Sequence, residues 1–217
     1  MDRLVHSAMA HPLPVRVDVR LARVLRVAAT MADEPRYYLD ALTAFDCEAA
    51  RKWRNPESVR AGLRTPYVLT AEMQEDFYRN VVCDRNSRHR YWAVREGGGV
   101  VAVEIYGGAV PDVFVAMVGL TDLQWENGVA EISLMVDPDR QGKGIGTAAL
   151  RLTLTEAFDR LRLLAVHGEV YEHNPAVNFW RRHADGEVLV PYRKYWDGVH
   201  WGAVMFWFTP DGKWRDR

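Results

Sequence analysis

The residues of this sequence best suited to chemistry form a glycine-rich turn between an apolar run and an amphipathic stretch. The turn reads Gln141-Gly142-Lys143-Gly144-Ile145-Gly146-Thr147. Glycine has no side chain to hold a ligand away from the backbone, and the first turn of a helix offers unpaired N–H groups and positive dipole charge. The segment therefore predicts a loop that cradles a diphosphate at the start of a helix.

Two common nucleotide-binding loops fit this spacing poorly. A Walker A loop needs a glycine five residues before its Gly-Lys pair and Ser or Thr after it, where this chain has Asp137 and Gly144. A dinucleotide-binding loop needs an acidic residue about 20 residues after its glycines, where this chain has Leu164, and Glu169 comes late. A turn whose glycines serve only close packing stays open as the simplest alternative.

Further segments accompany this turn in a recognisable order. They are the strand-like run Ala130–Val136, Trp53-Arg54-Asn55-Pro56-Glu57, Gly119-Leu120-Thr121, Trp125-Glu126-Asn127 and the block from His173 to Trp180. With Gln141-x-x-Gly144-x-Gly146 at their centre, they make the stretch from about Tyr37 to Phe208 resemble the GNAT superfamily of acyl-CoA-dependent N-acyltransferases. The similarity is greatest to the branch that holds ribosomal-protein N-terminal acetyltransferases and amino-sugar N-acetyltransferases.

The resemblance implies a fold of the α/β (α+β) class, with a mixed central sheet whose two parallel strands splay apart and helices on both faces. It also implies acetyl-CoA as the cofactor, with its pantetheine arm on the backbone of the splayed strands. The residues expected to bind it are Met135, Val136, Gln141, Gly142, Lys143, Gly144, Ile145, Gly146, Thr147, Asn174 and Trp180.

Acetyl transfer to an amine needs a base for the ammonium proton and an acid for the departing thiolate. Family members carry a catalytic glutamate where this chain has Glu131, and strand alternation places Ser133 on the same face. Relatives with a tyrosine acid place it where this chain has Trp180, and indole cannot protonate a thiolate. Tyr171, Tyr192 or water is left as the proton source.

The acceptor cleft of the family is walled by the first helix and the final hairpin. In those regions this chain has Trp53, Arg54, Asn55, Tyr195, Trp196 and Trp201. Aromatic faces beside arginine suit an amino sugar linked to a nucleotide. Core packing of the tryptophans, a protein N-terminus as acceptor, and a non-catalytic acyl-CoA-binding domain of the same fold stay open as alternatives.

Length and composition fit a single domain. The chain has 217 residues, and we expect residues 37–217 to form the domain and residues 1–36 to form a loosely packed extension or a mis-assigned start. A net charge of -1 gives no indication of nucleic-acid binding, and no apolar stretch is long enough to span a membrane. The two cysteines fit the cytoplasm, the seven histidines show no metal-ligand spacing, and we expect a monomer or homodimer.

Periodicity and turn residues predict the elements. We expect strands at 37–42, 90–96, 100–106, 113–123, 130–136, 163–172, 186–196 and 199–208, and helices at 46–53, 70–83, 147–161 and from Pro175. In the first helix Asp46 is the expected cap and Leu42, Phe45 and Ala49 the buried stripe. Asp197-Gly198 is the expected hairpin turn, and residues 97–112 an additional hairpin.

Overall fold

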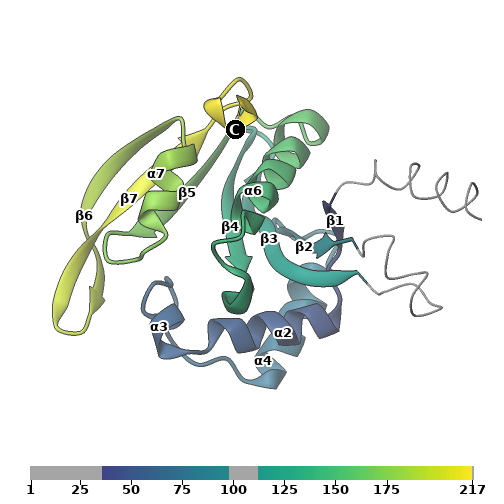
Figure 1. Cartoon of the computed structure of the whole chain (residues 1–217), viewed down its shortest axis with the longest axis horizontal. Helices are drawn as coiled ribbons and strands as arrows, with labels where there is room; N and C mark the ends of the chain where they lie inside the picture. Colours follow the sequence, from purple (N-terminus) through teal and green to yellow (C-terminus); the bar gives the residue numbers. More distant parts are fainter. Residues whose placement is uncertain (1–35, 98–111, 217) are drawn as a thin grey trace, which may run out of the picture.

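One seven-stranded sheet organises the chain (Figure 1). The computed structural model describes residues 36–97 and 112–216. The strands are β1 (Tyr37–Ala41), β2 (Arg90–Glu96), β3 (Val113–Gln124), β4 (Val129–Val136), β5 (Ala165–Tyr171), β6 (Gly186–Trp196) and β7 (Val199–Phe208). Their spatial order is β1-β2-β3-β4-β5-β7-β6, and every neighbouring pair is antiparallel except β4 and β5.

The parallel pair β4 and β5 is joined over a short length. Val129–Glu131 pair with Ala165–His167, and the two strands then diverge (Figure 1). Each strand keeps its antiparallel neighbour beyond that point, β3 for β4 and β7 for β5. The sheet therefore forks after Glu131, as the resemblance to acyltransferases predicts.

Helices cover both faces of the sheet. They are α2 (Ala44–Arg54), α3 (Glu57–Arg60), α4 (Ala71–Phe77), α6 (Ile145–Thr155) and α7 (Val177–His183), and the ends of α4 and α6 widen into π-helical turns at Tyr78–Val82 and Glu156–Arg160. Two 3-10 turns, Pro138–Arg140 and Lys213–Asp216, complete the list. The faces of α6 and α7 pack with Ile132, Val166 and Phe206 in one core, whereas α2 and α4 lie over the opposite face.

The first helix differs from its prediction at both its cap and its buried stripe. It begins at Ala44, and Thr43 is the cap, with Asp46 three residues on completing a capping box in which each side chain bonds the other's backbone N–H. Phe45 is 90% exposed, because the buried face of α2 runs through Asp46, Cys47 and Ala50 and leaves this position outside it. Leu42 and Cys47 are buried, as is Ala50 in place of the expected Ala49.

The other elements lie close to their predicted bounds. The hairpin strands β6 and β7 span residues 186–196 and 199–208 as expected, and their turn has positive φ at Asp197 (50°) and Gly198 (75°). The predicted strand 100–106 and most of the predicted hairpin 97–112 lie outside the described residues. The short helix α3 and the 3-10 turn Pro138–Arg140 were not among the predicted elements.

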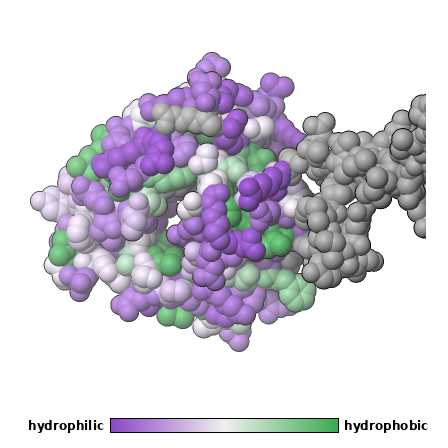
Figure 2. Space-filling model, viewed as in Figure 1, coloured by the Kyte–Doolittle hydropathy of each residue, from purple (hydrophilic) through white to green (hydrophobic). Residues whose placement is uncertain are grey.

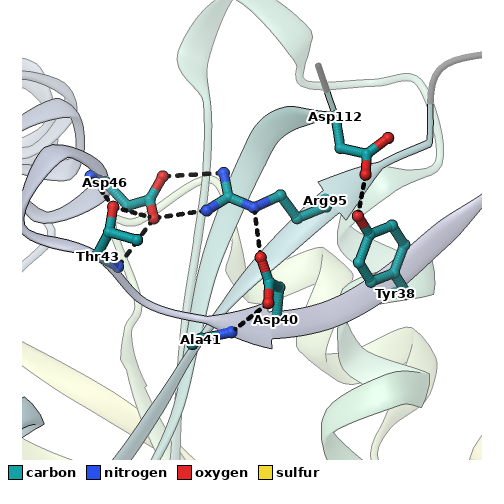
Figure 3. Close-up of polar contacts among 7 residues, drawn as sticks. All are labelled: Tyr38, Asp40, Ala41, Thr43, Asp46, Arg95 and Asp112. Atoms are coloured by element: carbon teal, nitrogen blue, oxygen red, sulfur yellow. Dashed lines mark hydrogen bonds and ion pairs between the residues drawn. The ribbon is translucent and has the colours of Figure 1, made fainter. Parts of the chain in front are cut away.

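An ion-pair cluster joins the first two strands to α2 (Figure 3). Arg95 of β2 donates to both carboxylate oxygens of Asp46 at 3.0 and 2.8 Å and to Asp40 of β1 at 3.0 Å. Beside it the Tyr38 hydroxyl donates to Asp112. Because the Arg95 side chain is 14% exposed and that of Asp46 7%, this pair belongs to the framework of the fold.

The face of the molecule seen in Figure 2 is mostly hydrophilic, with separate hydrophobic patches, and it is hollowed between the side that carries β6 and β7 and the side that carries α6. No helix in the described part of the chain is long and apolar enough to cross a membrane.

Candidate active site

The glycine loop has the backbone that its sequence predicts. Gly142 (φ 76°) and Gly144 (φ 83°) are both in the left-handed region, and Gly144 is the N-cap of α6. A Cβ atom added at either position would meet no atom within 4 Å. The loop therefore opens to solvent, and the free N–H groups of the first helical turn are accessible to an anion.

The residues around the loop hold its position. At Gly146 an added Cβ would lie 3.4 Å from the Phe179 ring, so this glycine permits close packing of α6 on α7. Thr147 Oγ1 lies 3.2 Å from His183 Nε2, and His183 Nδ1 lies 2.8 Å from the Phe179 carbonyl oxygen. Because a carbonyl can only accept, Nδ1 carries a hydrogen and donates it to Phe179, while Nε2 faces the Thr147 hydroxyl.

The polar side chains of Lys143 and Gln141 lie at the loop without closing it. Lys143 Nζ donates to the Asp139 carbonyl at 3.4 Å, and the exposed Gln141 ends the preceding 3-10 turn. Met135 and Val136 form the end of β4 that leads into this turn, where they pair with Met117 and Ala116 of β3. One continuous segment of chain, β4 and the turn after it, therefore runs from the fork of the sheet to the glycine loop.

Glu131 stands at the fork, in the last residue pair that joins β4 to β5. Ser133 and Met135 share its face of β4, opposite the buried Ile132, and the same face of β5 carries His167, Glu169 and Tyr171. This face looks toward the loop between α3 and α4. The polar groups of the two strands therefore meet where the strands separate.

Two arginines and two glutamates form an ion-pair network across the fork. Arg64 Nη2 donates to Glu131 Oε1 at 2.6 Å and Nη1 to Oε2 at 3.2 Å, and Nη2 lies 3.5 Å from Glu169 Oε1. Arg193 of β6 donates to Glu169 Oε2 at 2.8 Å. The Glu169 side chain is 5% exposed and that of Glu131 22%. The hydrogen bond to Glu131 raises the pKa of Arg64.

Tyr171 and Lys194 complete this face of the site. The Lys194 ammonium lies 4.9 Å from the centre of the Tyr171 ring and 5.3 Å from that of Trp196, and it donates to the Leu63 carbonyl. Burial lowers the pKa of Lys194. Burial, followed by the charge of Glu169, raises the pKa of Tyr171, so the phenol keeps its proton at neutral pH.

An irregularity in β6 brings two neighbouring cations to one face. The pairing with β7 breaks between Val190 and Lys194, and Tyr192 within the break has φ 56°. Arg193 then reaches Glu169 while Lys194 reaches Tyr171, two residues apart on the same face of β5. Tyr192 itself is 80% exposed, and its ring lies 6.2 Å from that of His200.

Several predicted site residues have structural partners. Trp180 is buried in the core of the α6–α7 face, and its ring stacks on that of Phe206 with centres 4.4 Å apart. The ring is therefore used in core packing and not in the expected contact with the cofactor. Trp53 stacks on Phe114 at 4.8 Å. Arg54 donates to Thr65, and Asn55 exchanges two hydrogen bonds with the Leu69 backbone, both 2.9 Å long. Asn174 accepts from Ala176 N and donates to the Gly62 carbonyl.

The hairpin residues divide between the site and solvent. Trp201 packs on His173, with ring centres 4.8 Å apart, on the face that carries Tyr171. Trp196, together with Glu57 and Asp197, lines a cavity of about 340 Å³ between α3 and the hairpin tip. Tyr195 is 64% exposed and lies against His200.

The sequence prediction missed four charged residues of the site: Arg64, Glu169, Arg193 and Lys194. Alternation along β5 could have found Glu169, since it shares a face with Tyr171. Arg64 leaves no such signal, because its partner is 67 residues away. Within the described ranges no group of three or more His, Cys, Asp or Glu residues could hold a metal ion.

Comparisons with known proteins agree with this fold. The model of a family described as "Acetyltransferase (GNAT) domain" matches residues 36–178. No match was found among curated proteins.

Solved structures share the fold at low sequence identity. A spermidine N-acetyltransferase from Vibrio cholerae in complex with CoA and spermine is 17% identical, with TM-score 0.66, over 82% of this chain and 97% of that chain. A dodecameric structure of spermidine N-acetyltransferase from the same organism is 18% identical, with TM-score 0.62, over 81% of this chain and 94% of that chain.

Proposed function

This chain belongs to the GNAT acetyltransferase family and is an N-acetyltransferase that uses acetyl-CoA, and from this premise we propose that it acetylates a small primary amine with Glu131 as general base. The observation that carries the proposal is the position of Glu131 at the fork of β4 and β5. A carboxylate there lies beside the backbone groups that the splayed strands leave for the pantetheine arm, and on the strand that leads to the glycine loop.

The donor half of the proposal rests on the loop. Residues 141–147 would hold the diphosphate of acetyl-CoA against the N-terminus of α6, with Lys143 contributing a positive charge. The backbone of Met135 and Val136 would bind the pantetheine arm. Thr147 would contribute its backbone N–H, because its hydroxyl is engaged by His183.

The chemistry then proceeds in one active site without a covalent enzyme intermediate. The acceptor's ammonium gives one proton to the Glu131 carboxylate, and the free amine attacks the thioester carbonyl carbon. The new C–N bond forms, the C–S bond breaks, and the nitrogen loses its second proton to solvent. Tyr171, whose phenol is protonated and faces the same side as Glu131, supplies the proton to the departing thiolate.

The acceptor itself is proposed from the side chains beyond Tyr171. Trp201 and Trp196 offer aromatic faces on which an amino sugar could stack. The nearby cations Lys194 and Arg193 already bind the Leu63 carbonyl and Glu169. Arg54, the phosphate clamp that the sequence suggests, is engaged by Thr65 instead. A polyamine is a second candidate, because Glu57, Asp197 and the Trp196 ring could bind a second ammonium in their cavity. A protein N-terminus is the third.

An acceptor panel tests this proposal. Purified protein is incubated with acetyl-CoA and glucosamine, a nucleotide-linked amino sugar, spermidine or a short peptide, and both free CoA and the mass of the acetylated product are followed. We expect an amino sugar to be acetylated with the highest kcat/KM. Acetyl-CoA binding without turnover of any amine would favour a non-catalytic acyl-CoA-binding domain.

Assembly and location are part of the same proposal. We propose a monomer or homodimer acting in the cytoplasm, which the two free cysteines, Cys47 and Cys83, are consistent with. Light scattering on the purified chain measures the oligomeric state, and a dodecamer would contradict it.

A further inference from the structure

Arg64 binds the carboxylate of Glu131, which the proposed reaction needs as its base. Its two terminal nitrogens contact both oxygens of Glu131, at 2.6 and 3.2 Å, in the bidentate arrangement that binds a guanidinium most firmly. An acceptor's ammonium would have to donate to the same oxygens before it could give up a proton. The two cations therefore compete for one place.

The same guanidinium also reaches the second carboxylate of the fork. Arg64 Nη2 lies 3.5 Å from Glu169, which has a second cationic partner in Arg193 at 2.8 Å. If Arg64 leaves, Glu169 keeps Arg193 and only Glu131 loses its partner. Without Arg64, one carboxylate of the fork, Glu131, would lack a cationic partner and could bind one other cation.

Arg64 is free to leave in a way that Arg95 is not. Arg95 also binds a carboxylate through two nitrogens, but its side chain is 14% exposed and its Asp46 partner 7% (Figure 3). The Arg64 side chain is 60% exposed and comes from the loop after α3. Its guanidinium can move into water at small cost in solvation, whereas that of Arg95 cannot.

We propose that Arg64 fills the ammonium subsite at Glu131 in the free enzyme, and that the acceptor binds by exchanging its ammonium for this guanidinium. The inference rests on the proposed role of Glu131. The exchange replaces one cation by one cation, so Glu131 is never left as a partly buried charge without a partner. Arg64 is then a specificity-determining residue: it rejects neutral ligands and weak cations, which cannot displace it.

The hydrogen bond to Glu131 raises the pKa of Arg64, so the guanidinium does not leave by losing its proton. It also cannot accept a proton from the substrate. While Arg64 is in place, Glu131 therefore cannot act as base, and proton transfer has to follow the exchange.

A binding experiment tests the exchange without any acetyl transfer. Ethylguanidinium, a soluble copy of the arginine head group, is titrated into wild type, R64A and R64A/E131Q, and binding is followed by NMR. We expect saturable binding to R64A with a Kd on the order of millimolar, and binding at least about tenfold weaker to wild type and to the double variant. Equal binding to all three proteins would overturn the inference.

Kinetics provide the second readout. Once an acceptor is in hand, R64Q should lower KM for the amine about two- to fivefold, the range for one partly exposed ion pair, and leave KM for acetyl-CoA unchanged. R79Q is the matched control, since it removes an exposed ion pair with Glu75 on the surface. A rise in the amine KM of R64Q would show that Arg64 holds the acceptor and would overturn the exchange.

The two proposals fail in different ways. If wild type acetylates no amine, the proposed function is contradicted, yet ethylguanidinium still reports whether Glu131 is a cation subsite that Arg64 fills. If amines are acetylated but R64A does not bind ethylguanidinium, the proposed function stands and the exchange does not.

Discussion

Two glycines with almost the same backbone allow the donor loop to be tested against a matched control. Gly144 in the loop has φ 83° and Gly198 in the β6–β7 turn has φ 75°, and an added Cβ meets no atom within 4 Å at either position. A side chain in the left-handed region costs about 1–2 kcal/mol at each. We therefore expect Gly144→Asp and Gly198→Asp to lower Tm by a similar amount, about 2–8 °C in a protein of this size.

Affinity for acetyl-CoA should separate the two variants. At position 144 the new carboxylate lies at the N-terminus of α6, where the diphosphate is expected. Two like charges about 5 Å apart repel by about 3 kcal/mol at an effective dielectric constant of about 20. Since about 1.4 kcal/mol is a factor of ten, Gly144→Asp should weaken binding about 100-fold.

Calorimetric titration with acetyl-CoA measures this difference, and Gly144→Ala separates the backbone effect from the charge. We expect Gly198→Asp to bind within about twofold of wild type, because the hairpin turn lies outside the donor loop. Wild-type affinity in Gly144→Asp, or an equal loss of affinity in Gly198→Asp, would show that residue 144 does not lie at the diphosphate.

Three further predictions follow from named contacts. Trp180→Ala removes a buried ring stacked on Phe206, so it should cost about 3–5 kcal/mol in urea unfolding; a loss under about 1 kcal/mol would show that the ring is not part of the core. Tyr171→Phe should lower kcat while KM for acetyl-CoA stays constant, and unchanged kcat would remove it as the acid. The hydrogen bond from Arg95 lowers the pKa of Asp40, so its contribution to stability is present above pH about 4 and lost as pH falls through the lowered value; acid titration of Asp40→Asn should show a shallower loss, and identical curves would contradict this.

Local signals predicted most of the fold. The β6–β7 hairpin was predicted at its observed bounds because Asp197-Gly198 supplies the positive φ that a tight turn needs. The cap of α2 was misplaced because Thr43 and Asp46 are both capping residues, and sequence alone does not show which one is the N-cap. Phe45 was expected inside because it stands at helical spacing from Leu42 and Ala49, but the buried face runs through Cys47 and Ala50 instead.

The charged half of the site could not be predicted in the same way. The Arg64–Glu131 pair joins residues 67 positions apart, and it forms because the loop after α3 crosses the fork of the sheet. Arg193 and Lys194 reach the same face of β5 only because the β6–β7 register breaks between Val190 and Lys194. No residue type in that stretch predicts the break. The backbone of the glycine loop was predictable, because its signal lies in seven consecutive residues.

A paired measurement on Glu131→Gln tests most directly whether Glu131 is the general base. Acetyl-CoA affinity is measured by calorimetry and amine acetylation by product mass, on the same preparations of variant and wild type. We expect unchanged affinity and turnover lowered by a factor of about 100 to 10,000, because a general base is lost while the donor loop is intact. Turnover equal to that of wild type near neutral pH would contradict the assignment of Glu131 as the base.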